Sequence, residues 1–472
     1  MGTISDKLMR IINTKEDIRQ ALISKGYDVP TSIPFKEYAK MISDLPCRVD
    51  SFPDIEGIVA RYSALGLTNE QMAANPVWVD KTGNGHDLQM KNFAWKEGSG
   101  ISDIYPGALV FDGVDDWAGC DNLPLLSKEK GYSIIALRNW ITRYDATQYK
   151  RPLISNLDTN DEGAFLIEYR KDENVNDVTG SYNSFTDVYI DDNNPITWQT
   201  SSSYNGQIIK KGTFKSTNKL CICKTYFGQL SNYDNAAIWE LIILDHDATE
   251  EELTKIKDYF VKTYPWLFPD QAWTVTGKTN EDEDRATIAN ITGNSNDLVL
   301  SNFGFVEGSG YNEEGEYAGY LVTDGVDDKV VSAESIAFTD TWTIITDTVF
   351  LGKVSVASGI LASNIFTVYN YQGSGTIAVT MGEGGSSLRV ITSSIKAFSS
   401  DGTIYDAEWN EYHVEIGTIR ALERLLKIGT SSNETSYFCQ LAFKFLGIYN
   451  NQILSKEDCI KAYNYLQTLK AK

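Results

Sequence analysis

The sequence has few of the residues on which catalytic and metal centres are usually built. It holds only three histidines, His86, His246 and His413, among 472 residues. We find none of them at ligand spacing from a second histidine, a cysteine or a carboxylate. The chain also lacks a G-x-S-x-G motif, a P-loop and a glycine-rich dinucleotide motif between a strand and a helix. These absences predict that the protein is not an enzyme and carries no cofactor.

Cysteine is scarce and scattered. The six cysteines include no C-x-x-C pair, and they are Cys47, Cys120, Cys221, Cys223, Cys439 and Cys459. Scattered thiols suit neither a zinc knuckle nor a redox pair. We therefore predict six reduced, structural cysteines in a protein made in a reducing cytoplasm.

Positive charge is in short supply. Lys and Arg number 42 against 64 Asp and Glu, which gives a net charge of −22 at pH 7. A chain this acidic repels phosphate backbones and anionic lipids. Long apolar runs are also missing: the opening MGTISDKLMRIINTK lacks the apolar stretch of a signal peptide, and no later segment is expected to span a bilayer. We expect no nucleic acid and no membrane among its partners.

Short β-type segments dominate from about residue 50 onward. YSIIAL, AFLIEYR, TWTIITDTVF and YHVEIGTI stand between clusters of Gly, Asn and Asp. Strands at this density, without helices between them, are typical of a β-sandwich or barrel.

This β-rich region contains one pattern twice. TGNGHDLQMKNFAWKEGSG at 82–100 matches TGNSNDLVLSNFGFVEGSG at 292–310, and the run DGVDD at 112–116 recurs at 324–328. The order and spacing of the matches agree, so the repetition indicates a duplicated domain.

Each copy ends with an apolar strand, IWELIIL or FKFLGIY, and then a helix capped by Thr249 or Ser455. The two prolines of YPWLFPDQ mark the joint between the copies. The sequence therefore predicts three parts: a helical segment at 1–47, one sandwich at 48–268 and a second at 269–472.

The first 47 residues are predicted to form short helices. Their apolar side chains recur at helical spacing, at Leu8, Ile11, Ile18, Leu22, Phe35, Tyr38 and Ile42. These side chains are too few to form a core, and burying each is worth on the order of 1.5–3 kcal/mol. We expect the segment to anchor the chain on another protein or on a second copy of itself, with a dimer favoured. A loosely attached appendage is the alternative.

The repeated DGVDD run has two interpretations, a turn and a calcium site. Asp-Gly is a turn dipeptide, because Gly accepts a positive φ and Asp hydrogen-bonds the backbone beyond it. The other reading is a calcium site, because carboxylates supply hard oxygen ligands. Its candidates are Asp112, Asp115 and Asp116 in the first copy and Asp324, Asp327 and Asp328 in the second. Calcium usually takes more oxygens than three residues supply, so we favour the turn and assign no metal.

A glycosidase would need two carboxylates about 5–5.5 Å apart, which two alternate residues of one strand can provide. We find no such pair inside an apolar strand. EDEDR at 281–285 lies in a polar, loop-like stretch, and Glu168 and Glu240 each stand alone on a strand, where an acid usually faces solvent. The sequence therefore gives no catalytic residue.

The order of these motifs resembles a known superfamily. A strand, T-G-N-x-x-D-L, about twenty residues, D-G-V-D-D and a Tyr- or Trp-led strand are similar to concanavalin A-like, laminin-G-like jelly rolls. The resemblance implies a mainly β protein with two tandem antiparallel sandwiches, each closed by a C-terminal helix, and carbohydrate or protein binding. INTKEDIRQALISKGYDVPTSIPFKEYAKMI resembles a leader on virion proteins of crAss-like Bacteroides phages.

Together these features predict a phage virion structural protein, of the head fibre or capsid decoration type, on the exterior of the particle. Its expected partners are other virion proteins, a second copy of the chain, and host or mucosal glycans held by its lectin-like sandwiches. Trp95, Trp117 and Trp140 are candidate sugar-stacking residues. A tail fibre or baseplate protein is one alternative, and a carbohydrate-active enzyme of the same fold is another.

Overall fold

The computed structural model describes Lys15, Arg19 and most of the chain from 52 to 471. Its gaps are 128, 142–149, 159–163, 171–185, 190–193, 202, 205–206, 209–215, 229–231, 353–357, 364–365, 371–375, 382–386, 418–422 and 431–437. By its internal contacts the chain divides into Met1–Asp54 and Ile55–Lys472. The seven predicted anchoring residues lie outside the described residues, so their role stays a prediction.

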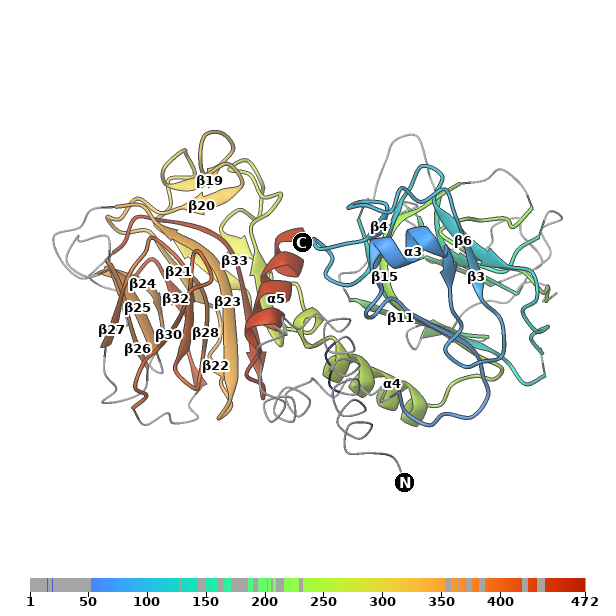
Figure 1. Cartoon of the computed structure of the whole chain (residues 1–472). Helices are drawn as coiled ribbons and strands as arrows, with labels where there is room; N and C mark the ends of the chain where they lie inside the picture. Colours follow the sequence, from blue (N-terminus) through green and yellow to red (C-terminus); the bar gives the residue numbers. More distant parts are fainter. Residues whose placement is uncertain are drawn as a thin grey trace, which may run out of the picture. The chain divides into compact units, whose positions relative to one another are not determined.

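The first half of the β-rich region forms two sheets (Figure 1). The strands of one are β1 (Ile58–Ser63), β4 (Gly100–Ile101), β5 (Leu109–Asp112), β7 (Ser133–Trp140), β11 (Ile196–Thr200), β12 (Ser203–Tyr204), β13 (Gln207–Ile208) and β15 (Asn235–Leu244). The strands of the other are β2 (Val77–Trp78), β3 (Leu88–Lys91), β6 (Trp117–Cys120), β8 (Lys150–Ser155), β9 (Phe165–Arg170), β10 (Thr186–Tyr189) and β14 (Leu220–Ile222). We call this pair the first sandwich.

The second half repeats the arrangement as the second sandwich. One of its sheets holds β16 (Gln271–Thr274), β19 (Gly310–Asn312), β20 (Tyr320–Val322), β23 (Trp342–Phe350), β28 (Ile395–Ser399), β29 (Thr403–Asp406), β30 (Glu411–His413) and β33 (Leu441–Asn450). The other holds β17 (Thr287–Ile288), β18 (Leu298–Ser301), β21 (Lys329–Ser332), β24 (Ser358–Ala362), β25 (Phe366–Asn370), β26 (Thr376–Met381), β27 (Ser387–Ile391) and β32 (Lys427–Ile428). A small extra ladder pairs β22 (Ile336–Ala337) with β31 (Glu423–Arg424).

Strand order is the same in both sandwiches. The run β4-β5-β15-β7-β11 corresponds to β19-β20-β33-β23-β28, and β2-β3-β6-β14-β8-β9-β10 corresponds to β17-β18-β21-β32-β24-β25-β26. The pairing is antiparallel except between β9 and β10, which run parallel. The prediction of a mainly β protein with two tandem jelly-roll sandwiches is confirmed.

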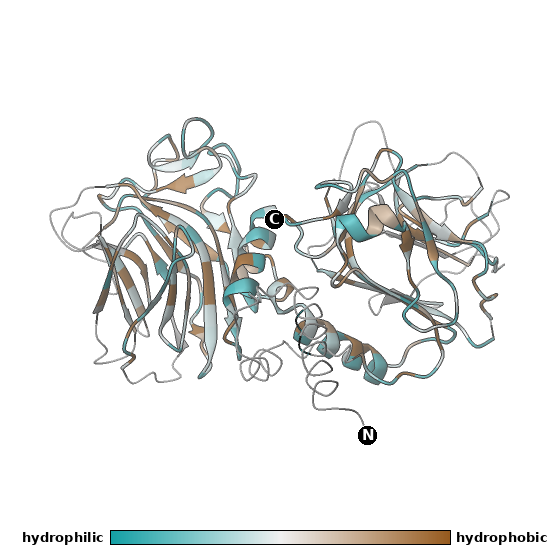
Figure 2. Ribbon diagram, viewed as in Figure 1, coloured by the Kyte–Doolittle hydropathy of each residue, from teal (hydrophilic) through white to brown (hydrophobic). Residues whose placement is uncertain are grey.

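Each sandwich has its own apolar interior. β3 shows why these segments form strands: Leu88 and Met90 point into the core, whereas Gln89 and Lys91 are exposed, as the two-residue period of a strand requires. The brown and teal segments of the ribbon trace the apolar and polar residues along the strands in Figure 2. The core clusters of the two sandwiches share no residue.

A helix follows the last long strand of each sandwich. α4 (Glu250–Thr263) begins with a capping box between Thr249 and Glu252, and α5 (Lys456–Thr468) begins at Ser455, whose hydroxyl accepts from the Asp458 amide. α5 packs closely on β33, because a Cβ at Gly447 would lie only 2.8 Å from Leu466 Cδ1. Both closing helices were predicted, and both are confirmed. None of the described helices combines the length and the apolar character that crossing a bilayer requires.

The joint between the two halves is short. α4 ends at Thr263, a 3-10 turn η1 (Pro265–Leu267) follows, and β16 starts at Gln271. Trp266 and Leu267 in this turn are buried. The proposed limits 48–268 and 269–472 stay a prediction, although the sheets change from one set to the other at this joint.

The described cysteines, Cys120, Cys221, Cys223, Cys439 and Cys459, are free and buried. Burial raises the pKa of the Cys120 thiol to about 11, so it stays protonated at neutral pH. Such thiols pack as small apolar groups.

Candidate functional site

The two DGVDD loops occupy equivalent places. The first joins β5 to β6, and the second joins β20 to β21. Gly113 and Gly325 adopt φ values of +74° and +76°, which glycine reaches at no steric cost. At Gly325 a Cβ would also lie 3.0 Å from the Gln440 backbone nitrogen. The glycine of the run is therefore required by the backbone.

The first aspartate of each run holds the turn. Oδ1 of Asp112 accepts from the backbone N–H groups of Val114, Asp115 and Asp116 at 2.8, 3.2 and 3.3 Å. The second copy repeats this arrangement.

There, Oδ1 of Asp324 accepts from Val326, Asp327 and Asp328 at 2.7, 3.3 and 3.4 Å. These are the hydrogen bonds that the turn reading of the sequence predicted.

The last aspartate of each run is buried. Oδ2 of Asp116 accepts from the Asp112 amide at 3.1 Å, and Oδ2 of Asp328 accepts from the Asp324 amide at 2.9 Å. Both residues are 0% exposed. Burial raises the pKa of each carboxyl to about 6. Burying a carboxylate is costly, and the hydroxyls of Ser99 and Ser309 offset part of that cost by hydrogen bonding to the two carboxyls.

The calcium candidates come together in both copies. One carboxylate oxygen from each of the three aspartates lies within 4.8 Å of the others, in the first run and in the second. However, the first aspartate of each run already accepts three N–H groups, and calcium takes six to eight oxygens. The structure thus gathers part of a ligand set, and the assignment of no metal to these loops stays a prediction.

In each sandwich, the repeated NF-x-aromatic stretch contacts the DGVDD loop. Asn92 and Asn302 adopt φ values of +70°, and their side-chain amides donate to the carbonyls of Asp115 and Asp327, each at 2.9 Å. The NF-x-aromatic stretch and the DGVDD loop therefore form one unit in each sandwich, which we call the paired loop. No contact between these two stretches was predicted from the sequence. The repeated asparagine before the aromatic residues was the signal that was missed.

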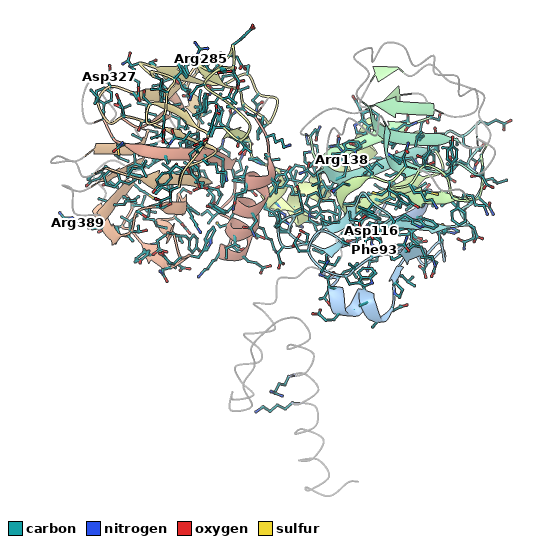
Figure 3. All side chains as sticks on the ribbon, turned by 90° about the horizontal axis from the view of Figure 1, so that it is seen from above. Phe93, Asp116, Arg138, Arg285, Asp327 and Arg389 are labelled. Atoms are coloured by element: carbon teal, nitrogen blue, oxygen red, sulfur yellow. The ribbon has the colours of Figure 1, made fainter. Side chains whose placement is uncertain are left out.

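Two aromatic rings lie next to this asparagine in each copy. The rings of Phe93 and Trp95 stack with centroids 4.9 Å apart and planes 18° apart, and those of Phe303 and Phe305 lie 6.0 Å apart. All four side chains are half-buried. Figure 3 labels Phe93 and Asp116 in the first paired loop, and Arg285 and Asp327 in the second sandwich.

Apolar side chains at the loop tips face solvent. Val114 is 72% exposed and Val326 is 71% exposed, at matching positions of the two runs. Each paired loop thus offers an exposed valine and half-buried rings held by a hydrogen-bonded turn. This mixture of apolar surface and fixed polar groups is typical of a binding surface.

The three candidate stacking tryptophans differ in access. Trp95 and Trp117 are half-buried. Trp140 is buried, its indole N–H donates to Asp234, and the Arg138 guanidinium lies 4.2 Å above its ring. Trp140 as a sugar-stacking residue is therefore wrong, because the ring belongs to the interior of the first sandwich.

The expectation that Glu240 faces solvent is also wrong. Glu240 is fully buried and forms an ion pair with Arg61 at 3.2 Å. The hydroxyls of Tyr259 and Tyr264 donate to its Oε1 at 2.9 and 2.8 Å. Burial raises the pKa of Glu240, and the Arg61 charge opposes that shift. The cluster lies where β1 and β15 meet α4, so it joins the sheet to its closing helix.

One histidine has carboxylate neighbours that we did not expect. His246 Nε2 lies 3.1 Å from Glu252 Oε1, and its Nδ1 lies 3.3 Å from Asp245 Oδ1. Glu252 also accepts from the Thr249 amide at the N-terminus of α4, so these contacts fix a helix end.

Comparison with known proteins gives structural likenesses only. The sequence matches no family model and no curated protein. A Trypanosoma rangeli sialidase bound to a difluoro-KDN compound is similar with a TM-score of 0.30 and 10% identity, over 49% of this chain and 41% of the sialidase. This chain thus spans less than half of that enzyme.

The binding domain of botulinum neurotoxin serotype D is similar with a TM-score of 0.32 and 10% identity, over 84% of this chain and 98% of that domain. The binding domain of botulinum neurotoxin DC, in complex with SialylT, is similar with a TM-score of 0.29.

These likenesses correct one expectation. The sequence analysis predicted that the protein is not an enzyme, yet sialidases stand among the similar structures beside the toxin binding domains. The firm exclusion of an enzyme is therefore wrong, and the chain is left with two classes of structural neighbour, one catalytic and one binding.

Proposed function

We propose that the chain is a glycan-binding protein of a phage virion, displayed on the particle exterior as a head fibre or capsid decoration. The observation that carries the glycan-binding part is the duplicated paired loop. Each copy presents half-buried aromatic rings beside an exposed valine, on a turn fixed by the same hydrogen bonds. Rigid aromatic surface of this kind packs against the apolar face of a ligand at little entropic cost.

Duplication supports the same proposal. Two weak sites on one chain reach a higher avidity than either site alone when both engage a polymer. A polysaccharide is such a polymer, because it repeats one epitope many times. The virion part of the proposal rests on the resemblance of the N-terminal segment to phage virion proteins. Other virion proteins and a second copy of the chain are the partners that follow from it.

A binding experiment with the intact chain tests the glycan part. The purified protein is titrated with mucin and with neutral polysaccharides, and compared with the variants Trp95→Ala and Phe305→Ala. We expect each variant to weaken binding and the double variant to weaken it most. The buried Trp140 makes no sensible control. Tyr317→Ala is the matched control, because Tyr317 is a half-buried aromatic residue between β19 and β20, outside both paired loops. Equal binding by all variants contradicts the paired loops as the sites.

Virion attachment has its own test. Antibodies against the sandwiches should label the surface of intact particles in electron micrographs. Particles without label, from a preparation in which the protein is detected in infected cells, contradict the virion assignment.

A further inference from the structure

A cluster of lysines and aromatic rings lies on the outward face of the β6 sheet in the first sandwich. Ala118 of β6 packs in the core, so its neighbour Trp117 points to the other face. The ring of Phe227 meets Trp117 edge-on, with centroids 5.8 Å apart and planes 89° apart. A Cβ at Gly119 would lie 2.8 Å from Trp117 and 3.2 Å from Phe227, so both rings lie close against the strand.

The ammonium groups of two lysines lie over these rings. Nζ of Lys224 lies 4.0 Å from the centre of the Trp117 ring, and Nζ of Lys219 lies 5.0 Å from the centre of the Phe227 ring. Burial raises the pKa of the intervening Cys221 thiol, and the charges of both lysines oppose that shift. The two cations therefore act on one small area of the sheet.

Lys224 is the unusual member. It is only 6% exposed, and its ammonium group packs over the Trp117 ring. Burial lowers its pKa. The Trp117 ring compensates part of the lost hydration, because the face of an indole attracts a cation. An ammonium group has three N–H donors, and the oxygen atoms of a ligand can accept from them.

The surroundings make the cluster distinctive. The chain carries a net charge of −22, so an area with two lysine cations over two rings has the opposite sign to the charge of the whole chain. Asp158 is the nearby acid that acts on Cys221 from the same area, and Asp115 acts on the neighbouring Tyr233. The second sandwich has Lys329 at the position of Trp117, so it lacks this ring. The cluster is a property of the first sandwich alone.

We propose that the Lys224–Trp117–Phe227–Lys219 cluster binds an acidic saccharide, with the lysines receiving its carboxylate or sulfate and the rings packing beside the sugar. The inference rests on the glycan binding proposed above and names the ligand class for one of the two sandwiches. A carboxylate or sulfate accepts from the Lys224 and Lys219 ammonium groups, and the half-buried rings pack against the C–H groups of the sugar.

The test uses the full chain and three soluble polymers: polygalacturonate, dextran sulfate and neutral dextran. Binding is followed by calorimetry and by tryptophan fluorescence at low and at moderate salt. The variants are Lys224→Met, which keeps the apolar stem, and Trp117→Leu. Lys257→Met is the matched control, because Lys257 is an exposed lysine on α4 and its removal changes the net charge equally. Thermal melting confirms that each variant is folded.

We expect at least one acidic polymer to bind, with affinity reduced roughly tenfold by Lys224→Met and unchanged by Lys257→Met. Binding of polygalacturonate alone identifies a carboxylate ligand, and binding of dextran sulfate alone identifies a sulfate ligand. The inference is overturned if neither acidic polymer binds, or if Lys224→Met and Lys257→Met weaken binding equally. Neutral glycans that bind through Trp95 and Phe305 while Lys224→Met has no effect would keep the general proposal and reject this site.

Discussion

At the scale of single residues, the buried charged groups of the first sandwich are where the structure differs most from the predictions made from the sequence. Glu240 and Arg61 stand on adjacent strands, where an alternating pattern predicts one buried and one exposed face. The pattern cannot show that a helix 10 residues further along covers the second face. Asp116 was read correctly as part of a turn, but its burial depends on packing between segments.

The Arg61–Glu240 pair should be costly to break. Arg61→Ala leaves a buried carboxylate without its cation, and we expect the free energy of unfolding to fall by about 3–5 kcal/mol. The double variant Arg61→Met with Glu240→Leu should recover much of that loss, because no charge is then buried. Urea denaturation of the three proteins measures both values. A single variant as stable as the wild type would show that the pair is not holding α4 on the sheet.

Asp116 and Asp328 should make stability depend on pH. Their pKa in the folded protein is about 6, above the ordinary value of 3.8, so the folded state keeps protons that the unfolded state releases. A group shifted upward in this way opposes folding as the pH rises from about 4 to about 6. We expect Asp116→Asn with Asp328→Asn to melt like the wild type near pH 4 and at a higher temperature near pH 7. Measurement in EDTA keeps metal away, and the exposed Asp115→Asn is the control.

At the scale of elements, the repeated motifs were the most predictable part of the molecule. DGVDD was expected to turn between two strands, and it does so twice, because glycine φ and the aspartate hydrogen bonds are local properties. The contact of Asn92 with Asp115 spans 23 residues and was not foreseen, because no local rule fixes which loops meet. For the same reason the Lys224–Trp117 contact was missed.

The turn itself can be weakened in either copy. Asp112→Ala removes an acceptor of three backbone N–H groups, and we expect a loss of roughly 1–2 kcal/mol in the stability of the first sandwich. Asp324→Ala should have a similar effect on the second. Calorimetric melting of both variants checks the values. A variant with unchanged melting would mean that water replaces the carboxylate without cost.

The effect of calcium on the melting temperature distinguishes the interpretation of these loops as turns from their interpretation as a metal site. A ligand that binds only the folded state raises its melting temperature. If the loops are turns that bind no calcium, the melting temperature in calcium should therefore equal that in EDTA. A rise with calcium in the wild type that is absent from Asp116→Asn with Asp328→Asn would establish a metal site in these loops. Magnesium serves as the comparison ion.

At the scale of the whole molecule, the chain combines a duplicated β-region with an N-terminal segment of different composition. The internal contacts separate Met1–Asp54 from Ile55–Lys472, and the boundary at residue 47 stays a prediction. The fold class followed from strand density and the repeat. Attachment and oligomeric state did not, because they depend on surfaces of other chains.

Removal of residues 1–46 tests the role of that segment. We expect the truncated protein to stay folded and soluble, because both cores lie beyond residue 54. It should elute as a monomer in size-exclusion chromatography with light scattering, and it should no longer join the particle. Normal occupancy of the truncated protein on virions would place the anchor elsewhere.

The separate cores of the two sandwiches have an evolutionary consequence. Because the clusters share no residue, a substitution that repacks one interior leaves the other untouched. After a duplication, one copy can then drift while its twin keeps the ancestral task. Trp117 follows the first DGVDD run and Lys329 follows the second, so the two copies differ at this matching position. We interpret this difference as a trace of such drift. The chain thus carries, within one gene product, the kind of divergence that usually separates two paralogues.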